Sequence, residues 1–302
     1  MTYAIVNPLL LPELLSSVAS YLHPEERYTC SFVCKAWNTF FNYFVWETCI
    51  VDHSQIARST FLVDDLRKHA HQIHNLTYRG LISPEHLSIQ YPNLILLRIQ
   101  FKLLTRSDAI KDGGGRTAAM NMWLGVAALI KNCSELTTVD LSANRNIPTT
   151  QIWEAIKDNP TVTNLRLHNV ELNWKQEHAF WSACTTLEKL DMEDCDIQQD
   201  DELHQRIIPD SFPKLQDIKL RHVKIEPGDL IAMMANSPQL RSLDWRGGRK
   251  SNWFDVFNLK KRMMMNPFEF SNFESLNLTG GGFGDEELAE LIQIGLFSVL
   301  ED

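Results

Sequence analysis

A short apolar pattern recurs along the chain from about residue 73 onward. Each copy has an apolar residue, two variable residues, a second apolar residue, one variable residue and a third apolar residue. Successive copies begin 21, 42, 26, 25, 28, 25 and 33 residues apart. The alternation at the end of each copy predicts a short strand. The eight copies are Ile73-Leu76-Tyr78, Leu94-Leu97-Ile99, Leu136-Val139-Leu141, Val162-Leu165-Leu167, Leu187-Leu190-Met192, Leu215-Ile218-Leu220, Leu240-Leu243-Trp245 and Phe273-Leu276-Leu278.

Helical stretches are predicted between these strands. In "TTQIWEAIKD" Thr150 is a candidate N-cap, and Ile152, Ala155 and Ile156 share one face. Such a strand and helix cannot bury their apolar edges alone, so neighbouring units must stack to form a core. Four copies also have a proline two residues before their first apolar position, which ends each helix before the next strand. These prolines are Pro92, Pro160, Pro213 and Pro238.

The repeated segment resembles the leucine-rich repeat family, and "LEKLDMEDCDI" (residues 187–197) resembles its cysteine-containing subtype. The resemblance implies an α/β fold, an irregular, horseshoe-like leucine-rich-repeat solenoid over residues 51–302. It implies about eight repeats, with insertions near 103–120 and 246–270. In the family an inward-facing Asn or Cys bonds to the backbone of adjacent coils, and Asn144 and Cys195 occupy that place here. The residues that depart from this pattern are Val170, Val223, Gly248 and Gly281.

Two or three short helices are predicted before the repeats. The first has one apolar stripe and a proline, Pro12, suited to its first turn. Pro24 begins a second helix, and a further apolar surface follows that is interrupted or bent near Cys34. Three short helices are too small to be stable alone, so the repeats or another protein must cover them. The stripe of the first helix consists of Leu11, Leu14, Leu15, Val18 and Leu22.

The stretch from Leu11 to about Trp46 resembles an F-box, which implies an F-box domain at residues 1–50. The matching features are "LPELL", Val18, Leu22, Pro24, "VCKAWN" and Val45-Trp46, whereas Arg27-Tyr28 departs from the usual aliphatic pair. F-box domains bind the Skp adaptor of SCF-type cullin-RING ubiquitin ligases, and associated repeats hold substrates. The resemblance therefore implies a Skp-type adaptor as partner. The residues it assigns to adaptor binding are Leu11, Pro12, Leu14, Leu15, Val18, Leu22, Val33, Cys34 and Trp37.

Composition and charge favour protein partners. The chain has 302 residues, of which 44% are hydrophobic and 22% charged, which is typical of a globular protein. Its net charge of -9 argues against attraction of the whole molecule to nucleic acid or anionic membranes. The N-terminus lacks a basic region, and prolines break its apolar run, so we expect neither a signal peptide nor a membrane span. We expect a cytoplasmic or nuclear protein.

Candidate chemistry is sparse. The six cysteines include no CxxC pair; Cys30 and Cys34, and likewise His71 and His74, are spaced as possible ligands but have no partner cluster. "KDGGGR" and "GGGFGD" resemble loops rather than phosphate-binding or dinucleotide-binding motifs. Neither a serine elbow nor a cysteine-histidine arrangement stands out. We therefore expect no catalytic residue, no metal, no cofactor and no enzymatic activity.

Substrate binding is expected on the strand face opposite the core, because side chains alternate along a strand. The insertion at 246–270 combines basic residues with aromatic ones, so it is either a helix packed by its aromatic residues or a docking site for an acidic or phosphorylated substrate segment. The candidate substrate-binding residues are Arg166, His168, Asp191, Lys219, Arg221 and Arg246 on strands, and Lys260, Lys261 and Arg262 in the insertion.

The sequence thus predicts the substrate-recognition subunit, or substrate adaptor, of an SCF complex in the ubiquitin conjugation pathway. The alternative is a non-enzymatic leucine-rich-repeat scaffold or regulatory module that acts through protein-protein interaction alone, since "LSANRNIPTTQIWEAIKDNPTVTNLRLHNV" resembles repeats of the ribonuclease-inhibitor type. In that case the first helices cap the repeat array. A leucine-rich GTPase activator would need an exposed catalytic arginine, which the sequence does not single out.

Overall fold

The computed structural model describes residues 11–52, 60–80, 82–100, 114–142, 147, 149–172, 174–197, 212–223, 233–234, 236–246 and 274–277. Its helices are α1 (Pro12–Tyr21), α2 (Pro24–Cys30), α3 (Lys35–Glu47), α4 (Thr60–His69), the 3-10 turn η3 (Ala70–Gln72), α5 (Pro84–Leu87), α7 (Gly114–Asn132), α8 (Gln151–Asp158) and α9 (Trp174–Cys184). Its strands are β1 (Thr48–Asp52), β2 (Asn75–Arg79), β3 (Leu96–Gln100), β4 (Thr138–Ser142), β5 (Asn164–His168), β6 (Glu171–Leu172), β7 (Lys189–Glu193), β8 (Asp196–Ile197), β9 (Asp217–Arg221), β10 (Ser242–Arg246) and β11 (Ser275–Asn277).

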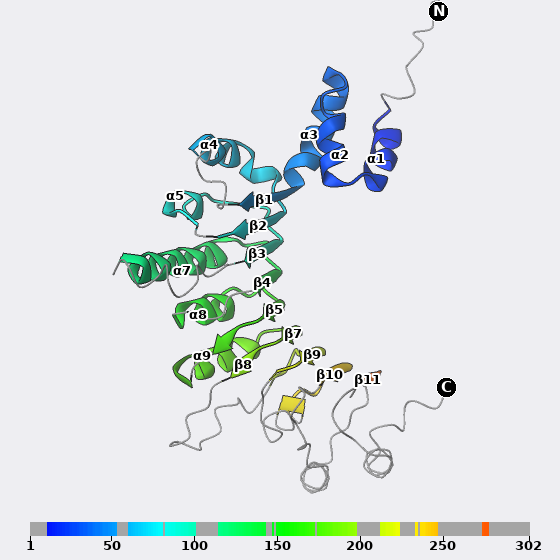
Figure 1. Cartoon of the computed structure of the whole chain (residues 1–302). Coiled ribbons are helices and arrows are strands. Elements are labelled where there is room, and N and C mark those ends of the chain that lie inside the picture. Colours follow the sequence, from blue (N-terminus) through cyan, green and yellow to red (C-terminus); the bar gives the residue numbers. More distant parts are fainter. Residues whose placement is uncertain are drawn as a thin grey trace, which may run out of the picture.

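Nine strands form one open parallel sheet. Its order is β1-β2-β3-β4-β5-β7-β9-β10-β11, so each strand is followed along the chain by its neighbour in space, while β6 and β8 form a separate small sheet. Helices α4, α5, α7, α8 and α9 lie along one side of the strands, and α1 to α3 extend beyond β1 (Figure 1). This arrangement confirms an α/β fold in which a helical segment precedes a repeated strand-helix unit.

The strand pattern read from the sequence is confirmed. The middle apolar residue of every predicted copy lies in a strand of the large sheet, from Leu76 in β2 to Leu276 in β11. The first and last residues of the final copy, Phe273 and Leu278, lie outside the described residues. Along β5, burial alternates between Leu165 and Leu167, which are buried, and Arg166, which is exposed. One face of the sheet therefore contributes to the core and the other carries polar side chains.

The sheet begins one strand earlier than the sequence analysis recognised. Strand β1 pairs in parallel with β2 over its whole length, so the expected boundary at residues 50 and 51 falls inside a strand. Trp46, Cys49 and Val51 repeat the apolar spacing of the later copies. Val51 is buried, and Trp46 and Cys49 pack against the main core. The last residues of the helical segment thus also form the first unit of the sheet.

In the long gap between the second and third predicted copies, the described residues contain no additional strand. Strand β3 pairs directly with β4, and among the described residues the gap holds the 19-residue helix α7. Residues 114–120 of the expected insertion belong to this helix, so the interpretation of "KDGGGR" as a loop is wrong for Gly114 to Arg116. Residues 103–113 and the insertion after Arg246 lie outside the described residues.

Turns on both sides of the strands are repeated as well. Pro92, Pro160, Pro213 and Pro238 all lie in turns shortly before a strand, as predicted. After the strands, the backbone adopts a left-handed conformation at Gly80, Asn169, Asp194 and His222. Each of these four residues donates its backbone N–H to the last carbonyl of the next strand in the sheet, at N–O distances of 2.8 to 3.0 Å. These hydrogen bonds extend the pairing beyond the strand ends.

The inward-facing polar position is filled unevenly. Cys195 is buried, and its Sγ lies 3.6 Å from the Leu167 carbonyl of a neighbouring strand and 3.3 Å from the Glu193 carbonyl. The side chain thus bonds to adjacent backbone as the family resemblance implies. Val170 and Val223 are buried at the corresponding place. The other three residues considered, Asn144, Gly248 and Gly281, lie outside the described residues.

Candidate functional site

Helices α1, α2 and α3 pack around a core of their own. Leu15 and Ala19 of α1 are buried against Phe41 of α3. Pro12 supplies the fixed backbone angle of the first turn of α1. In α2 the His23 backbone N–H donates to Glu26 Oε2 at 2.7 Å, which caps that helix. This core is small, so a large part of the apolar surface of the three helices remains outside it.

Arg27 connects the three helices. Its Nε donates to the carbonyl oxygens of Ala19, in the last turn of α1, and of Leu22, its C-cap, at 3.0 and 3.1 Å. Its guanidinium carbon lies 5.9 Å from the ring centroid of Phe44, and Nη1 lies 4.0 Å from Glu47 Oε2. The departure from an aliphatic residue at this position is therefore explained by an internal structural role, because an arginine donates to carbonyl oxygens at the end of α1 and an aliphatic side chain cannot.

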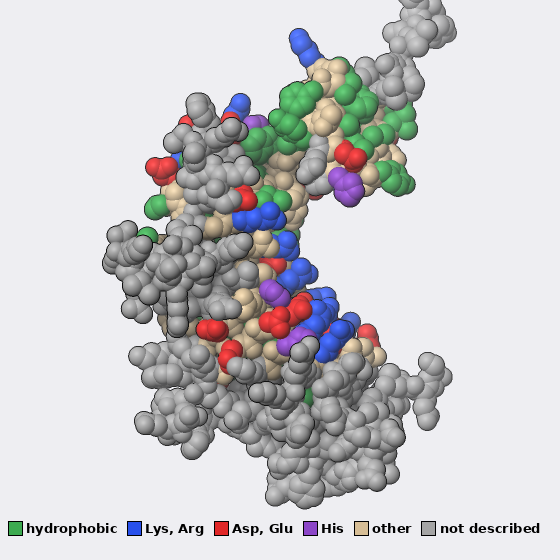
Figure 2. All heavy atoms as spheres, in the orientation of Figure 1, with side chains coloured by type: hydrophobic (Ala, Val, Ile, Leu, Met, Phe, Trp, Pro, Cys, Tyr) green, Lys and Arg blue, Asp and Glu red, His purple; other side chains and the backbone are tan. Residues whose placement is uncertain are grey.

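Helix α1 has a second apolar face that the described residues do not cover. Leu11, Leu14, Val18 and Tyr21 are 39%, 46%, 40% and 85% exposed. Their spacing of three and four residues places them along one side of the helix. We call these four residues the α1 stripe. Figure 1 shows α1 away from the sheet, and Figure 2 shows hydrophobic side chains gathered on this end of the molecule.

A second exposed apolar group lies at the turn between α2 and α3. Phe32 and Val33 are 68% and 62% exposed, and Cys34 is exposed at the N-cap of α3. Tyr28 packs edge-on against Phe32, with ring centroids 4.9 Å apart. The turn between α2 and α3 thus presents apolar side chains outward, where polar turn residues would be usual in an isolated domain.

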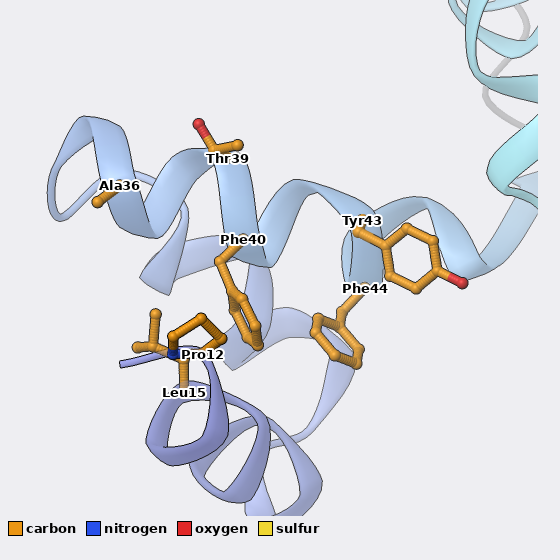
Figure 3. A pocket seen from close by; sticks show the side chains of 7 residues that line it. All are labelled: Pro12, Leu15, Ala36, Thr39, Phe40, Tyr43 and Phe44. Atoms are coloured by element: carbon orange, nitrogen blue, oxygen red, sulfur yellow. The ribbon is translucent and has the colours of Figure 1, made fainter. Parts of the chain in front are cut away.

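An apolar pocket lies between α1 and α3, beside their shared core. Its volume is about 410 Å³, and Figure 3 shows Phe40 and Phe44 reaching from α3 toward Pro12 and Leu15 on α1. The pocket is lined by Pro12, Leu15, Ala36, Thr39, Phe40, Tyr43 and Phe44. A partner that covers α1 would find an apolar recess beside that helix.

The structure places the predicted adaptor residues in three environments. Leu15 is 4% exposed, so its side chain belongs to the helical core rather than to the open surface, although it also lines the pocket. Leu22 and Trp37 are half-buried against the same core. The remaining six are exposed, namely Leu11, Pro12, Leu14, Val18, Val33 and Cys34.

The sequence analysis did not include three exposed aromatic residues among these candidates: Tyr21, Tyr28 and Phe32. Tyr21 could have been found from the spacing of Leu14, Val18 and Tyr21, because it continues the same side of the helix. Tyr28 and Phe32 had no such signal, since their exposure depends on where α2 ends.

The predicted substrate residues on strands share one face of the large sheet. Arg166 and His168 lie on β5, Asp191 on β7, Lys219 and Arg221 on β9, and Arg246 on β10; the strands between Arg166 and Lys219 are paired in register. Figure 2 shows charged and histidine side chains gathered over these strands on a hollowed side of the molecule. Lys260, Lys261 and Arg262 lie outside the described residues, so the hypothesis about the basic insertion stays a prediction.

Ion pairs join several of the charges on this face. Arg98 Nε lies 2.7 Å from Asp140 Oδ2, and Lys189 Nζ lies 3.0 Å from Asp217 Oδ2. The Arg221 guanidinium lies 3.5 Å from Glu193. These pairs connect neighbouring strands, so a large part of the charge on the face is neutralised locally.

One group on the same face has the composition of a metal site. His168, Glu193 and Asp194 each offer an atom, and these atoms lie within 4.8 Å of one another. Arg221 Nη1 lies 3.5 Å from Glu193 Oε2, and a bound cation would compete with that guanidinium for the carboxylate. The geometry therefore favours an ion-pair network at this place.

Burial controls the chemistry of four cysteines. Burial raises the pKa of Cys49, Cys133 and Cys195 to about 11, and it raises the pKa of Cys184 well above its usual value. The reactive form of cysteine is the thiolate. These four side chains are therefore protonated at neutral pH and poorly suited to nucleophilic attack.

In the part of the chain that the structure describes, no helix is sufficiently long and apolar to cross a membrane.

Comparisons with known proteins agree with this division of the chain. Residues 12–50 match the family model described as F-box-like, which corresponds to α1 through most of β1. Residues 162–255 match the model for the leucine-rich repeats of FBD-associated F-box protein At5g56370. None of the curated proteins matches the chain. The two family matches support an F-box protein with leucine-rich repeats, in which an F-box is followed by a repeat region.

Proposed function

We propose that the chain is the substrate-recognition subunit of an SCF-type cullin-RING E3 ubiquitin ligase. Its F-box, at residues 1–50, binds a Skp-type adaptor, and its repeats, at residues 51–302, form an irregular horseshoe-like solenoid that holds a protein substrate. The transfer of ubiquitin is carried out by other subunits, so the chain itself needs neither catalytic residues nor a cofactor. We expect it to act in the cytoplasm or the nucleus.

The α1 stripe carries this proposal. A stable domain buries such side chains, and covering a half-exposed leucine or valine contributes about 1 kcal/mol. The stripe is continuous along α1 and exposed, and among the described residues it is α3 that makes the main contacts with β1 and η3. An apolar face of this kind beside a recess is typical of a protein-protein interface.

The alternative is a scaffold or regulatory module that binds partners through its repeats alone. In that case α1 to α3 would serve as a cap, and a cap is expected to bury its apolar side chains against the repeats. The exposure of Leu14, Val18 and Tyr21 speaks against this role. The contact of Trp46 with His69, in which the rings stack 4.2 Å apart, nevertheless agrees with α3 closing the end of the sheet. Helix α3 can thus cap the repeats while α1 binds an adaptor.

The test is co-expression of the full chain with a Skp adaptor, followed by affinity purification. We expect stoichiometric capture of the unaltered chain. A variant with Leu14→Asp and Val18→Asp places two charges in the stripe, where an interface would have to bury them, and we expect capture to fall by at least about 100-fold. Both side chains are exposed, so the helical core is retained.

The matched control is Ser16→Asp with Ser20→Asp, which adds the same two charges to exposed positions of α1 away from the stripe. We expect this control to be captured like the unaltered chain. Undiminished capture of the stripe variant would reject the α1 interface. A folded, unaltered chain that fails to bind the adaptor would favour the scaffold.

A further inference from the structure

Charges of alternating sign cross the open face of the sheet in register. Neighbouring members of this row are paired directly across successive strands, from β3 to β10. The sign of the charge changes at every strand. The row consists of Arg98, Asp140, Arg166, Asp191, Lys219 and Asp244.

The ends of this row are held by ion pairs. Arg98 is paired with Asp140 at 2.7 Å. Asp244 accepts from Arg221 at 3.4 Å and from Arg246 at 3.0 Å. These residues therefore already have partners of opposite charge, and another protein would have to displace those partners in order to bind them.

The centre of the row differs from its ends. Within the described part of the chain, Arg166, Asp191 and Lys219 form neither ion pairs nor side-chain hydrogen bonds. Arg166 and Lys219 are exposed, and Asp191 is half-buried between them. We call these three residues the central triad. It presents a positive, a negative and a positive charge on β5, β7 and β9.

The spacing of the triad restricts the partner. Neighbouring strands are about 4.8 Å apart, so the two cations are separated by about 10 Å along the sheet. Two turns of an α-helix rise about 11 Å, which matches the distance between the two cations. One turn rises about 5 Å and reaches Asp191 between them. In an extended segment, alternate side chains are about 7 Å apart and reach about 13 Å at the next step, which overshoots the second cation. A helix lying across the strands matches the triad best.

From this charge pattern we infer that the repeats bind a substrate helix that crosses β5, β7 and β9. The helix presents an acidic residue, a basic residue three or four positions later, and an acidic residue seven positions after the first. This inference rests on the proposed function, in which the repeats hold the substrate. Each exposed contact is weak alone, but like charges directly opposed disfavour the wrong partner, so the triad acts mainly on specificity.

The experiment uses two fluorescent alanine-rich helical peptides that differ only in charge. One carries Glu, Lys and Glu at positions i, i+4 and i+7, and the other carries Lys, Glu and Lys at the same positions. Fluorescence polarisation with the full chain at low ionic strength measures both affinities. We expect the first peptide to bind about 10-fold more tightly, and this preference to shrink as salt is added. Equal affinities, or binding by neither peptide, would overturn the inference.

Protein variants locate the preference. Arg166→Glu, Asp191→Lys and Lys219→Glu together invert the triad, and we expect the peptide preference to invert with it. The control exchanges the neighbouring ion pair, with Lys189→Asp and Asp217→Lys, on two of the same strands. This exchange conserves the pair, so the preference should remain. A preference that the triad variant leaves unchanged would also overturn the inference.

Adaptor capture distinguishes this failure from failure of the proposed function. The triad lies on the sheet and the α1 stripe on the first helix, so the triad variant should still be captured by the Skp adaptor. If the adaptor captures the chain but the chain shows no peptide preference, the substrate helix is rejected and the proposed function stands. A peptide preference in a chain that no adaptor captures would support the same helix-binding face in a scaffold.

Discussion

At the scale of single residues, the position before each repeat proline is as regular as the proline itself. Its occupants are all buried, although two of them are polar. Proline restricts the preceding residue to extended backbone, as the φ of -93° and ψ of 103° at Asn159 illustrate. The sequence analysis recognised the prolines and missed their predecessors, because these share no side-chain chemistry. They are Tyr91, Asn159, Phe212 and Ser237.

Asn159 joins two consecutive repeats. Its Nδ2 donates to the carbonyl oxygens of Ile130 at 2.7 Å and Cys133 at 2.9 Å. Its Oδ1 accepts from the backbone N–H of Thr161 at 3.1 Å and from the Thr161 hydroxyl at 2.7 Å. The amide thus uses both donor hydrogens and both acceptor positions. One of its partners, the Ile130 carbonyl, belongs to the last turn of α7. Carbonyl groups at this end of a helix have no partner within the helix.

We predict that Asn159→Ala destabilises the protein by about 2–4 kcal/mol, because the Ile130 carbonyl and the Thr161 backbone N–H lose the hydrogen bonds of this buried amide. Urea unfolding at fixed pH measures the difference. The matched control is Asn93→Ala. The exposed Asn93 side chain donates one hydrogen bond, from Nδ2 to the His71 carbonyl at 2.6 Å. Its loss should lower the free energy of unfolding by no more than about 1 kcal/mol. Equal losses in the two variants would contradict this account of Asn159.

At the scale of elements, apolar periodicity predicted the strands well and the surfaces poorly. Strands β2 to β10 of the large sheet were found because each buries two alternating side chains, and the same spacing located β11. Strand β1 was missed because Trp46 also ends the F-box pattern, so its second role as the start of a repeat was hidden. Periodicity predicted one apolar stripe on α1, whereas the helix has two faces. Leu15 and Ala19 point into the core, and Leu14 and Val18 remain exposed.

Helices α5 and α7 approach each other closely at a glycine of α7. A Cβ added to Gly125 would lie 2.6 Å from Leu87 Cδ1 and 3.2 Å from its Cβ. We predict that Gly125→Ala destabilises the protein by about 1 kcal/mol. Overpacking costs about 1–3 kcal/mol, which outweighs the gain of about 1 kcal/mol in helix propensity. Thermal or urea unfolding of the variant measures the net effect.

A double-mutant cycle separates the two contributions to this prediction. In the Leu87→Ala background the side chain that would clash is shortened, so Gly125→Ala should become neutral or stabilising by up to about 1 kcal/mol. The difference between the two backgrounds is the interaction between the residues. If Gly125→Ala has the same effect in both, contact with Leu87 is not the reason for the glycine.

At the scale of the whole molecule, α3 leads into the sheet without a linker. Helix α3 ends at Glu47 and β1 begins at Thr48. The Glu47 carbonyl accepts from the His74 backbone N–H at 3.0 Å, and Trp46 stacks on His69. These contacts hold the end of α3 against the first repeats. In the proposed ligase subunit, the orientation of the adaptor-binding helices is therefore coupled to the face that holds the substrate.

The charged face illustrates what one sequence cannot reveal about the whole molecule. Arg98 and Asp140 are 42 residues apart in the chain, and their ion pair exists because β3 and β4 are in register. Alternation along the strands predicted that both side chains leave the core. Which charges neutralise one another depends on rotamers and on the pairing of strands. The separation of the central triad from its paired neighbours therefore required the structure.

Titratable groups lie in or against the core along much of the sheet, from half-buried Cys49 in β1 to buried Cys195 after β7. Burial raises the pKa values of four cysteines, and it also raises those of Tyr78 and Tyr91, whose hydroxyls are 3.0 Å apart in the core. Above the usual thiol pKa of 9.0, the unfolded chain loses these protons while the folded chain keeps them. Stability then falls as pH rises, because the folded state binds more protons than the unfolded state.

We therefore predict that the free energy of unfolding decreases between pH 9 and about pH 11, with a slope that reflects several protons. Each fully raised group contributes about 1.4 kcal/mol per pH unit in this window. Cys133→Ala should reduce the slope by up to one proton, because burial raises the pKa of Cys133 to about 11. The control variant is Cys34→Ala, which removes an exposed thiol at the N-cap of α3. Urea unfolding under reducing conditions at several pH values gives the slopes, and comparing slopes removes any pH-independent effect of the substitutions. A slope that both variants change equally would mean that burial of Cys133 does not contribute to the alkaline loss of stability.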